Sequence, residues 1–277
     1  MSFNPDKQHT LKSSVQISGT GLHTGVMADL TLHPANPGFG YQFKRIDLPN
    51  QPVIKADCDL VTDVSRGTTL EANGAKVSTV EHVLAALVGM GIDNCLLEIN
   101  GPEMPIMDGS SMPFVELIEE AGILEQDAAK VWYSIDENIF HYDEEKRVEM
   151  VAMPAMEYQV TTLIDFNSPV LGTQHAGLKH LRDFKDHIAS CRTFCFLHEL
   201  EMLLEHNLIK GGDVNNAIVI VDKPVDDTEL ERLRKIFKKD KIEVKSEGYL
   251  NNLELRFPNE PARHKLLDVI GDLALIG

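Results

Sequence analysis

Basic side chains are scarce in this sequence. It has 26 lysine and arginine residues against 43 aspartate and glutamate residues, which gives a formal net charge of −17. A protein that binds nucleic acid needs a basic surface to meet the phosphate backbone, whereas the acidic residues here are spread along the whole chain. We therefore expect no nucleic-acid partner.

Long apolar runs are also absent. No run approaches the ~20 residues that a membrane-spanning helix requires. The first residues, MSFNPDKQHTLKSS, lack the basic and apolar segments of a secretory signal. We expect a cytoplasmic protein without a transmembrane segment.

Cysteine is rare, and the four cysteines form no CxxC pair. Without a secretory context or a second pair, neither a disulfide framework nor a zinc ribbon is indicated. Cys191 and Cys195 are spaced so that they could share a metal, but small buried hydrophobic side chains are the simpler interpretation. We expect Cys58, Cys95, Cys191 and Cys195 to be reduced thiols.

What the sequence does contain is typical of a folded globular protein. With 277 residues, of which 43% are hydrophobic and 25% charged, the chain can form two domains with separate cores. Each half begins with short strands and continues with helices, which favours an α+β fold of two two-layer sandwiches. The polar stretch 125–130 is the best linker candidate, so we predict domains over residues 1–128 and 129–277.

Individual elements follow from periodicity and turn signals. Helices are predicted from residue 78 to about 89 and over 114–121, 183–190, 198–206 and 228–237, and a terminal helix is predicted that includes residues 264–274. Strands are predicted over 9–18, 28–34, 40–47, 94–99, 131–136, 147–154, 158–166 and 217–222. Asn73-Gly74 predicts a two-residue hairpin turn within 68–79.

The last predicted helix has two different faces. Taking 100° per residue, its apolar side carries Leu266, Leu267, Ile270, Leu273 and Ala274. His264, Asp268 and Asp272 share the other side, where His264 and Asp268 are one turn apart and Gly271 keeps the surface low. An imidazole and a carboxylate suit zinc, but spacing alone favours an ordinary solvated face.

The helix that follows Ser78 has a similar layout. Glu81 and His82 point away from the stripe of Val80, Val83, Leu84 and Leu87. A histidine here and two ligands from another element would form a three-ligand site with an open position, which is typical of catalytic zinc. Glu81 would then be a general base, although Ser78-Thr79-Val80-Glu81 also fits a capping box, and spacing alone favours the cap.

Several strings together resemble one enzyme family. They are GTGLHTG (19–25), STVEHVLAAL (78–87), GIDNCLLEINGPEMPIMDGS (91–110), CRTFCF (191–196), KGGDVNNAIV (210–219) and RHKLLDVIGDL (263–273). In collinear order over essentially the whole chain, they are similar to the UDP-3-O-acyl-N-acetylglucosamine deacetylases of lipid A synthesis in Gram-negative bacteria. This resemblance outweighs the interpretations from spacing alone.

The resemblance implies a zinc enzyme that releases acetate from a UDP-linked, 3-O-hydroxyacylated N-acetylglucosamine at the committed step of that pathway. His82, His264 and Asp268 match the metal ligands, and ferrous iron could replace zinc in such a set. Glu81 matches the general base and Thr193 the hydroxyl that stabilises the oxyanion. The metal is expected between the two sandwich domains.

Further roles follow from the same resemblance. Asp272 matches the carboxylate that orients a catalytic histidine, and Lys265 and His23 look like contacts to the diphosphate and sugar. Phe194 is expected to form a wall of the sugar pocket. Residues 194–216 are expected to form the acyl-chain passage, with substrate contacts from Phe196, Leu197, Leu200 and Gly212, although ordinary helix core explains each apolar residue equally well.

One expected residue is missing. In the family a further segment carries the histidine that Asp272 orients, and none of the 11 histidines here has a matching context. We therefore expect this chain to bind zinc but to hydrolyse slowly, and a fused downstream enzyme domain is possible. The competing hypotheses are an amidohydrolase for another acylated amino sugar, a non-catalytic nucleotide-sugar binding protein, and an α+β domain without a metal.

Overall fold

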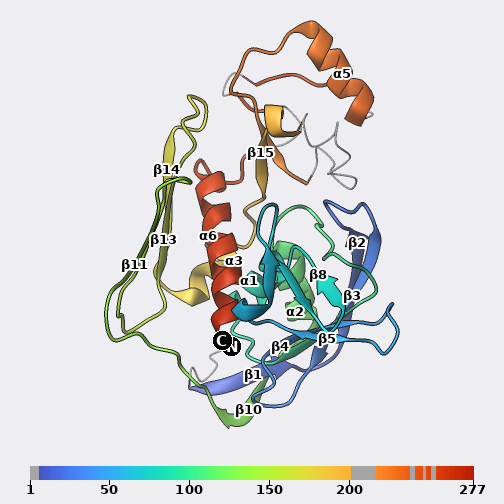
Figure 1. Cartoon of the computed structure of the whole chain (residues 1–277), viewed down its shortest axis with the longest axis vertical. Helices are drawn as coiled ribbons and strands as arrows, with labels where there is room; N and C mark the ends of the chain where they lie inside the picture. Colours follow the sequence, from blue (N-terminus) through green and yellow to red (C-terminus); the bar gives the residue numbers. More distant parts are fainter. Residues whose placement is uncertain (1–5, 201–215, 238–240, 246–247, 251–253) are drawn as a thin grey trace.

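The computed structural model describes the chain except residues 1–5, 201–215, 238–240, 246–247 and 251–253 (Figure 1). The α+β class expected from the sequence is confirmed, with helices packed against several small sheets. The division into domains at residue 128 stays a prediction.

The largest sheet in the described residues has five strands in the order β2-β3-β9-β4-β5. The strands are β2 (Val15–Thr20), β3 (Met27–Pro34), β9 (Cys95–Ile99), β4 (Tyr41–Arg45) and β5 (Val53–Lys55). Only β9 and β4 run parallel among these neighbours. In β3 the side chains of Ala28, Leu30 and Leu32 alternate with more exposed ones and are buried in the core, as expected for a sheet with one covered face.

A three-stranded sheet precedes the first helix. It contains β6 (Val61–Asp63), β7 (Thr69–Ala72) and β8 (Ala75–Val77), with the short helix η1 (Cys58–Leu60) just before it. Asn73 and Gly74 both have positive φ, 54° and 73°, between the paired strands β7 and β8. The predicted hairpin is therefore confirmed, since its turn needs two residues that tolerate this conformation.

Two predictions about the ends of the first half are wrong. The expected strand 9–18 is broken after Leu11, so that β1 (Lys7–Leu11) and β2 belong to different sheets. The polar stretch expected as a linker lies largely within a strand, β10 (Ile123–Ala129), which pairs antiparallel with β1. Pairing with β1 satisfies the backbone groups along one edge of β10, which a polarity argument does not anticipate.

The second half begins with two hairpins. β11 (Ile139–Asp143) pairs with β12 (Val148–Ala152), and β13 (Val160–Asp165) pairs with β14 (Thr173–Leu178). The strand predicted over 131–136 is wrong, because the chain there has no regular structure. The predicted helix 183–190 is only the short pair η2 (Leu181–Asp183) and α3 (Phe184–His187).

The remaining elements lead to the last helix. β15 (Phe194–Phe196) runs parallel to β16 (Ile218–Ile220), and α5 (Asp227–Phe237) follows. Helical structure is present at 197–200, but most of the predicted helix 198–206 lies outside the described residues. The chain closes with α6 (Glu260–Leu273) and η3 (Ala274–Ile276). None of the described helices has both the length and the apolar composition needed to cross a bilayer.

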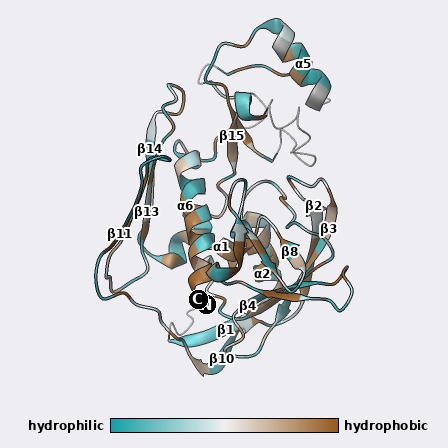
Figure 2. Cartoon of the chain, viewed as in Figure 1, coloured by the Kyte–Doolittle hydropathy of each residue, from teal (hydrophilic) through white to brown (hydrophobic). Residues whose placement is uncertain are grey.

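Helix α6 is the central element of the molecule. It packs against α1 (Glu81–Gly89) on one side and against β13 and β14 on another (Figure 1). Hydrophilic and hydrophobic residues alternate along it (Figure 2), yet even His264 on its polar side is only 2% exposed. The solvated face that spacing alone favoured is therefore wrong for His264, because α1 covers that side.

Gly271 explains how the two helices approach so closely. A Cβ atom added there would lie 2.0 Å from the backbone oxygen of Glu81, far inside van der Waals contact. The absence of a side chain at this position lets α6 lie directly against the first turn of α1. Helix α2 (Met112–Ala121), which ends at Gly122 as expected, contacts α1 as well.

Candidate metal centre

Three side chains from the two central helices converge on one point. His82 comes from the first turn of α1, and His264 and Asp268 lie one turn apart on α6. Asp268 Oδ1 is 3.3 Å from His264 Nε2 and 3.7 Å from His82 Nε2, and one donor atom of each residue lies within 4.8 Å of the others. Ligands of a tetrahedral zinc ion are about 3.4 Å apart, as bond lengths near 2.1 Å require, so this donor set fits the ion.

Hydrogen bonds orient two of these groups. The carbonyl oxygen of Cys191 lies 3.0 Å from His264 Nδ1, and because it can only accept, Nδ1 must carry the proton and Nε2 must present its lone pair. Lys265 Nζ donates to Asp268 Oδ2 at 3.0 Å, which leaves Oδ1 toward the two imidazoles. Ser111 Oγ donates to the carbonyl of His82 at 2.7 Å and ties the first turn of α1 to the segment before α2.

The electrostatics favour the charge states that a metal requires. Burial lowers the pKa of His82 to about 3, with a further contribution from His264, and burial also lowers the pKa of His264. Burial alone would raise the pKa of Asp268, but the nearby His264, Lys265 and His82 outweigh it and lower this pKa. Two neutral imidazoles and an ionised carboxylate are the forms that coordinate zinc.

Glu81 lies beside this cluster and does not cap its helix. The N-cap position is occupied by Val80, which makes no side-chain cap bond, and the N–H of Ser78 donates to Pro102 instead. The carboxylate of Glu81 accepts from the backbone N–H of Thr68 at 3.0 Å. The capping-box interpretation is therefore wrong. Burial, reinforced by the charge of Asp268, raises the pKa of Glu81 to about 8.

Thr68 links two acidic groups and was not singled out from the sequence. Its N–H binds Glu81, and its hydroxyl donates to Asp272 Oδ1 at 2.6 Å. Burial raises the pKa of Asp272 to about 6. No motif marks Thr68, and these contacts join residues that are 13 and 204 positions away, so only the fold brings them together.

A cavity of about 1310 Å³ opens over the cluster. Among the residues expected to act on substrate or metal, those that line it are Glu81, His82, Thr193, Phe194, Phe196, Leu200, His264, Lys265, Asp268, Asp272 and His23. Its far wall comes from β12 and β13, including Val148, Met150 and Leu163. The cavity thus joins a polar, metal-binding end to a long apolar wall.

Aromatic side chains form part of this apolar wall. Phe166, which sequence reasoning missed, contacts the rings of both Phe194 and Phe196 edge to face, with centroids 5.7 Å apart in each case. Lys265 Nζ lies 5.7 Å from the centre of the Phe194 ring, within cation–π range. Lys265 therefore lies between Asp268 of the metal cluster and the ring of Phe194.

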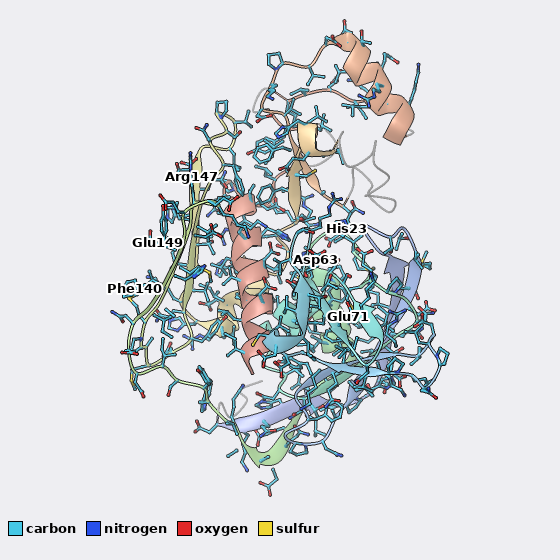
Figure 3. All side chains as sticks on the ribbon, viewed as in Figure 1. His23, Asp63, Glu71, Phe140, Arg147 and Glu149 are labelled. Atoms are coloured by element: carbon cyan, nitrogen blue, oxygen red, sulfur yellow. The ribbon has the colours of Figure 1, made fainter. Side chains whose placement is uncertain are left out.

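His23 reaches the cavity from the opposite side to β12. Figure 3 shows His23 and the β12 residue Glu149 on the two sides of α6. The ring Nε2 of His23 is 2.8 Å from the carbonyl oxygen of Arg66, and its backbone N–H donates to the buried carboxylate of Glu103 at 2.9 Å. Glu103 also accepts from Thr24 and from the hydroxyl of Thr79, so it joins the His23 loop to the residues before α1.

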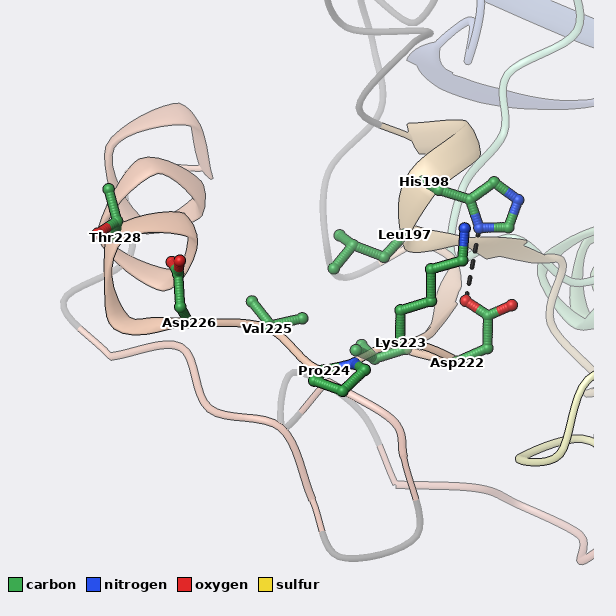
Figure 4. Close-up of a pocket in the computed structure, with 9 residues that line it drawn as sticks. Leu197, His198, Asp222, Lys223, Pro224, Val225, Asp226 and Thr228 are labelled. Carbon is green, nitrogen blue, oxygen red and sulfur yellow. Dashed lines mark ion pairs between the residues drawn. The ribbon is translucent and has the colours of Figure 1, made fainter.

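One expected substrate contact, Leu197, is not brought to this cavity. Leu197 lines a separate, smaller cavity of about 360 Å³, where His198 Nδ1 lies 3.5 Å from Asp222 (Figure 4). The side chain of Leu197 packs in a second small core with Leu200 and Val219. Gly212 lies outside the described residues. The contact expected from Gly212 stays a prediction.

Comparison with known proteins defines the class to which this fold and site belong. The chain matches the family described as UDP-3-O-acyl N-acetylglycosamine deacetylase, LpxC, over residues 8–242 and 231–277. It is 41% identical over 271 residues to the UDP-3-O-acyl-N-acetylglucosamine deacetylase of Myxococcus xanthus, covering 98% of this chain and 78% of that protein. This chain belongs to the LpxC deacetylase family.

Other relatives are longer. The bifunctional enzyme LpxC/FabZ of Chlorobaculum tepidum is 49% identical over 278 residues, which cover 98% of this chain and 58% of that protein. The enzyme of the same name from Bacteroides thetaiotaomicron is 46% identical, with 98% and 59% covered. The chain therefore spans about three-fifths of the length of these two bifunctional relatives.

Proposed function

We propose that this chain removes the N-acetyl group of a UDP-linked 3-O-acyl-N-acetylglucosamine in a zinc-dependent hydrolysis that releases acetate, as the committed step of lipid A synthesis. The observation that carries the proposal is the convergence of His82, His264 and Asp268 at the floor of a cavity that also holds Glu81 and Thr193. The names of the family and of its relatives support the substrate class.

The metal ligands in this proposal are His82 Nε2, His264 Nε2 and Asp268 Oδ1. A bound zinc ion would supply Lewis acidity, which polarises the amide carbonyl and makes a water molecule more acidic. Ferrous iron accepts the same ligands, so reconstitution with each metal is needed to identify the physiological one.

Glu81 acts as the general base. Its carboxylate is held by the N–H of Thr68 at the edge of the cluster. Burial and the charge of Asp268 raise its pKa, and the positive charge of a bound zinc ion would lower it again, so that the carboxylate can accept a proton near neutral pH. Glu81 takes the proton of the attacking water. A general acid must then protonate the leaving nitrogen, and Asp272 is proposed to orient such a group.

The other residues bind and orient the substrate. The hydroxyl of Thr193 donates to the carbonyl oxygen as negative charge develops on it. Lys265 and His23 contact the diphosphate and sugar, and Phe194 forms a wall of the sugar pocket. Phe196, Leu200 and the β12 and β13 wall accept the acyl chain, because an apolar chain gains free energy when this surface is covered.

We further infer that the reaction takes place in the cytoplasm, where nucleotide-linked sugars are available.

The two bifunctional relatives described above carry a second enzyme name. We propose that their deacetylase activity resides in the part that this chain matches. The two-domain division, with the metal between the halves, belongs to the same proposal.

The test is acetate release from UDP-3-O-acyl-N-acetylglucosamine by metal-free and zinc-reconstituted protein. We expect activity only with metal, and substitution Glu81→Gln should lower kcat by on the order of 10²-fold or more while zinc content is kept. Substrates that differ in acyl length would identify the preferred chain. A zinc-loaded protein that releases no acetate, or a Glu81→Gln variant with full activity, would contradict the proposal.

A further inference from the structure

A buried ion pair connects the start of α6 to the loop before β15. Arg192 and Glu260 are 4% and 0% exposed. Arg192 Nε and Nη2 donate to the two carboxylate oxygens of Glu260 at 2.9 and 3.1 Å, and the backbone N–H of Arg192 donates to Oε1 at 3.0 Å. The N–H of Arg256 donates to Oε2 at 2.6 Å. One carboxylate therefore holds two chain segments at the beginning of α6.

The neighbours of Arg192 are the groups that face the metal centre. On one side, the carbonyl of Cys191 accepts from His264 Nδ1. On the other side, Thr193 lines the cavity, and its N–H donates to Gly109 at 2.8 Å. Glu260 lies one turn before His264 on α6. The ion pair thus sets the position of the loop relative to the helix that carries two metal ligands.

Stability alone is a weak explanation for this pair. Removing two charges from water costs about as much as their attraction returns, so a buried ion pair contributes little net stability compared with apolar side chains of similar size. What such a pair does well is fix the geometry of the segments that it joins, because its hydrogen bonds are directional.

A second pair in the chain allows this role to be tested. Arg45 is also buried, binds both carboxylate oxygens of Asp47 at 2.9 and 2.8 Å, and donates to the backbone carbonyl of Lys76. Arg192 likewise binds one carboxylate through two nitrogens and donates to the backbone carbonyl of Glu254. The two pairs differ in what they join, because Asp47 is two residues from Arg45 and 29% exposed, whereas Glu260 is 68 residues from Arg192 and 0% exposed.

We propose that Arg192 and Glu260 are positioning residues for the metal centre. By holding the 191–193 loop against α6, they keep the Cys191 carbonyl on His264 Nδ1, which fixes the metal-binding tautomer, and they place the Thr193 hydroxyl over the cavity. The part that concerns Thr193 rests on the proposed function, whereas the part that concerns His264 needs only metal binding.

The experiment compares Arg192→Lys with Arg45→Lys in the full chain. Each change keeps the charge and removes the two-pronged hydrogen bond, and chemical denaturation measures the stability that each variant loses. We expect the zinc dissociation constant, measured by competition with a chromophoric chelator, to rise roughly 10- to 100-fold for Arg192→Lys and to stay at the wild-type value for Arg45→Lys. The absorption spectrum of the cobalt-substituted protein should change only for Arg192→Lys, because it reports ligand geometry.

Activity separates the two parts of the proposal. In zinc-saturated protein we expect Arg192→Lys to lower kcat more than it changes KM, since Thr193 acts on the developing charge. The milder substitution Glu260→Gln keeps a carbonyl acceptor at the same place, so its zinc affinity should lie between those of the wild type and Arg192→Lys. This variant also tests the inference if Arg192→Lys does not fold. Equal zinc affinity and equal cobalt spectra for the Arg192, Glu260 and Arg45 variants would overturn this inference alone. A wild-type chain that binds no zinc would overturn the proposed function as well.

Discussion

The close contact between α1 and α6 can be tested with the substitution Gly271→Ala, which adds a single methyl group. The added Cβ would lie 2.0 Å from the carbonyl oxygen of Glu81 and 2.9 Å from its Cα atom. Both are backbone atoms, so no side-chain rotation relieves the clash. Because ordinary contacts are roughly 3.5 Å, α6 must move away from α1 by about 1 Å or more.

Two effects of this substitution oppose each other. Alanine in place of glycine within a helix stabilises it by about 1 kcal/mol, whereas overpacking costs about 1–3 kcal/mol. The net loss in free energy of unfolding should therefore be small, no more than about 2 kcal/mol. Metal binding should respond far more strongly, since ligand distances tolerate only about ±0.2 Å, and His82 is on one helix while His264 and Asp268 are on the other.

We therefore expect Gly271→Ala to weaken zinc binding by about 100-fold or more, measured by chelator competition alongside urea denaturation. Gly89→Ala is the matched control, because its Cβ would lie 2.1 Å from the buried ring of Phe184 and so overpacks a helix end without separating the metal ligands. It should lose stability and keep zinc affinity. Wild-type zinc affinity in Gly271→Ala, or an equal loss in Gly89→Ala, would refute the reasoning.

Three further predictions concern the thiols, a turn and the oxyanion. Burial raises the pKa values of Cys95, Cys191 and Cys195 to about 12, so thiolate forms there only at strongly alkaline pH. At pH 8 a disulfide reagent should therefore titrate only the exposed Cys58 quickly. A second fast-reacting thiol in the native protein would contradict this prediction. Gly74→Ala should cost about 1 kcal/mol in urea denaturation, because Gly74 has a φ of 73° with open space around it; an unchanged midpoint would argue against the turn. Thr193→Val should lower kcat roughly 10- to 100-fold with zinc content retained, and an unaffected kcat would remove Thr193 from the mechanism.

The sequence predicts local features of the site well. Helical periodicity places His264 and Asp268 on one face of α6 and separates Glu81 and His82 from the apolar stripe of α1, as the structure has them. The hairpin at Asn73-Gly74 follows equally from local turn chemistry. In each case the prediction depends on residues within a few positions of one another.

Predictions that depend on distant partners were less successful. Whether the polar face of α6 meets solvent or another helix depends on α1, which lies more than 170 residues earlier in the chain. The stretch 125–130 resembles a linker until β1 provides a partner for its backbone. Glu81 fits a capping box until its carboxylate binds the N–H of Thr68. Resemblance to a family supplied the pairing of the helices, but not Thr68, Phe166 or the Arg192–Glu260 pair.

The central claim is that His82, His264 and Asp268 bind one metal ion together. The most direct measurement is anomalous X-ray scattering at the zinc edge from crystals of the zinc-loaded chain. The account predicts one strong peak about 2.0–2.2 Å from His82 Nε2, His264 Nε2 and an oxygen of Asp268. A peak elsewhere, or one that any of these three side chains fails to reach, would contradict it.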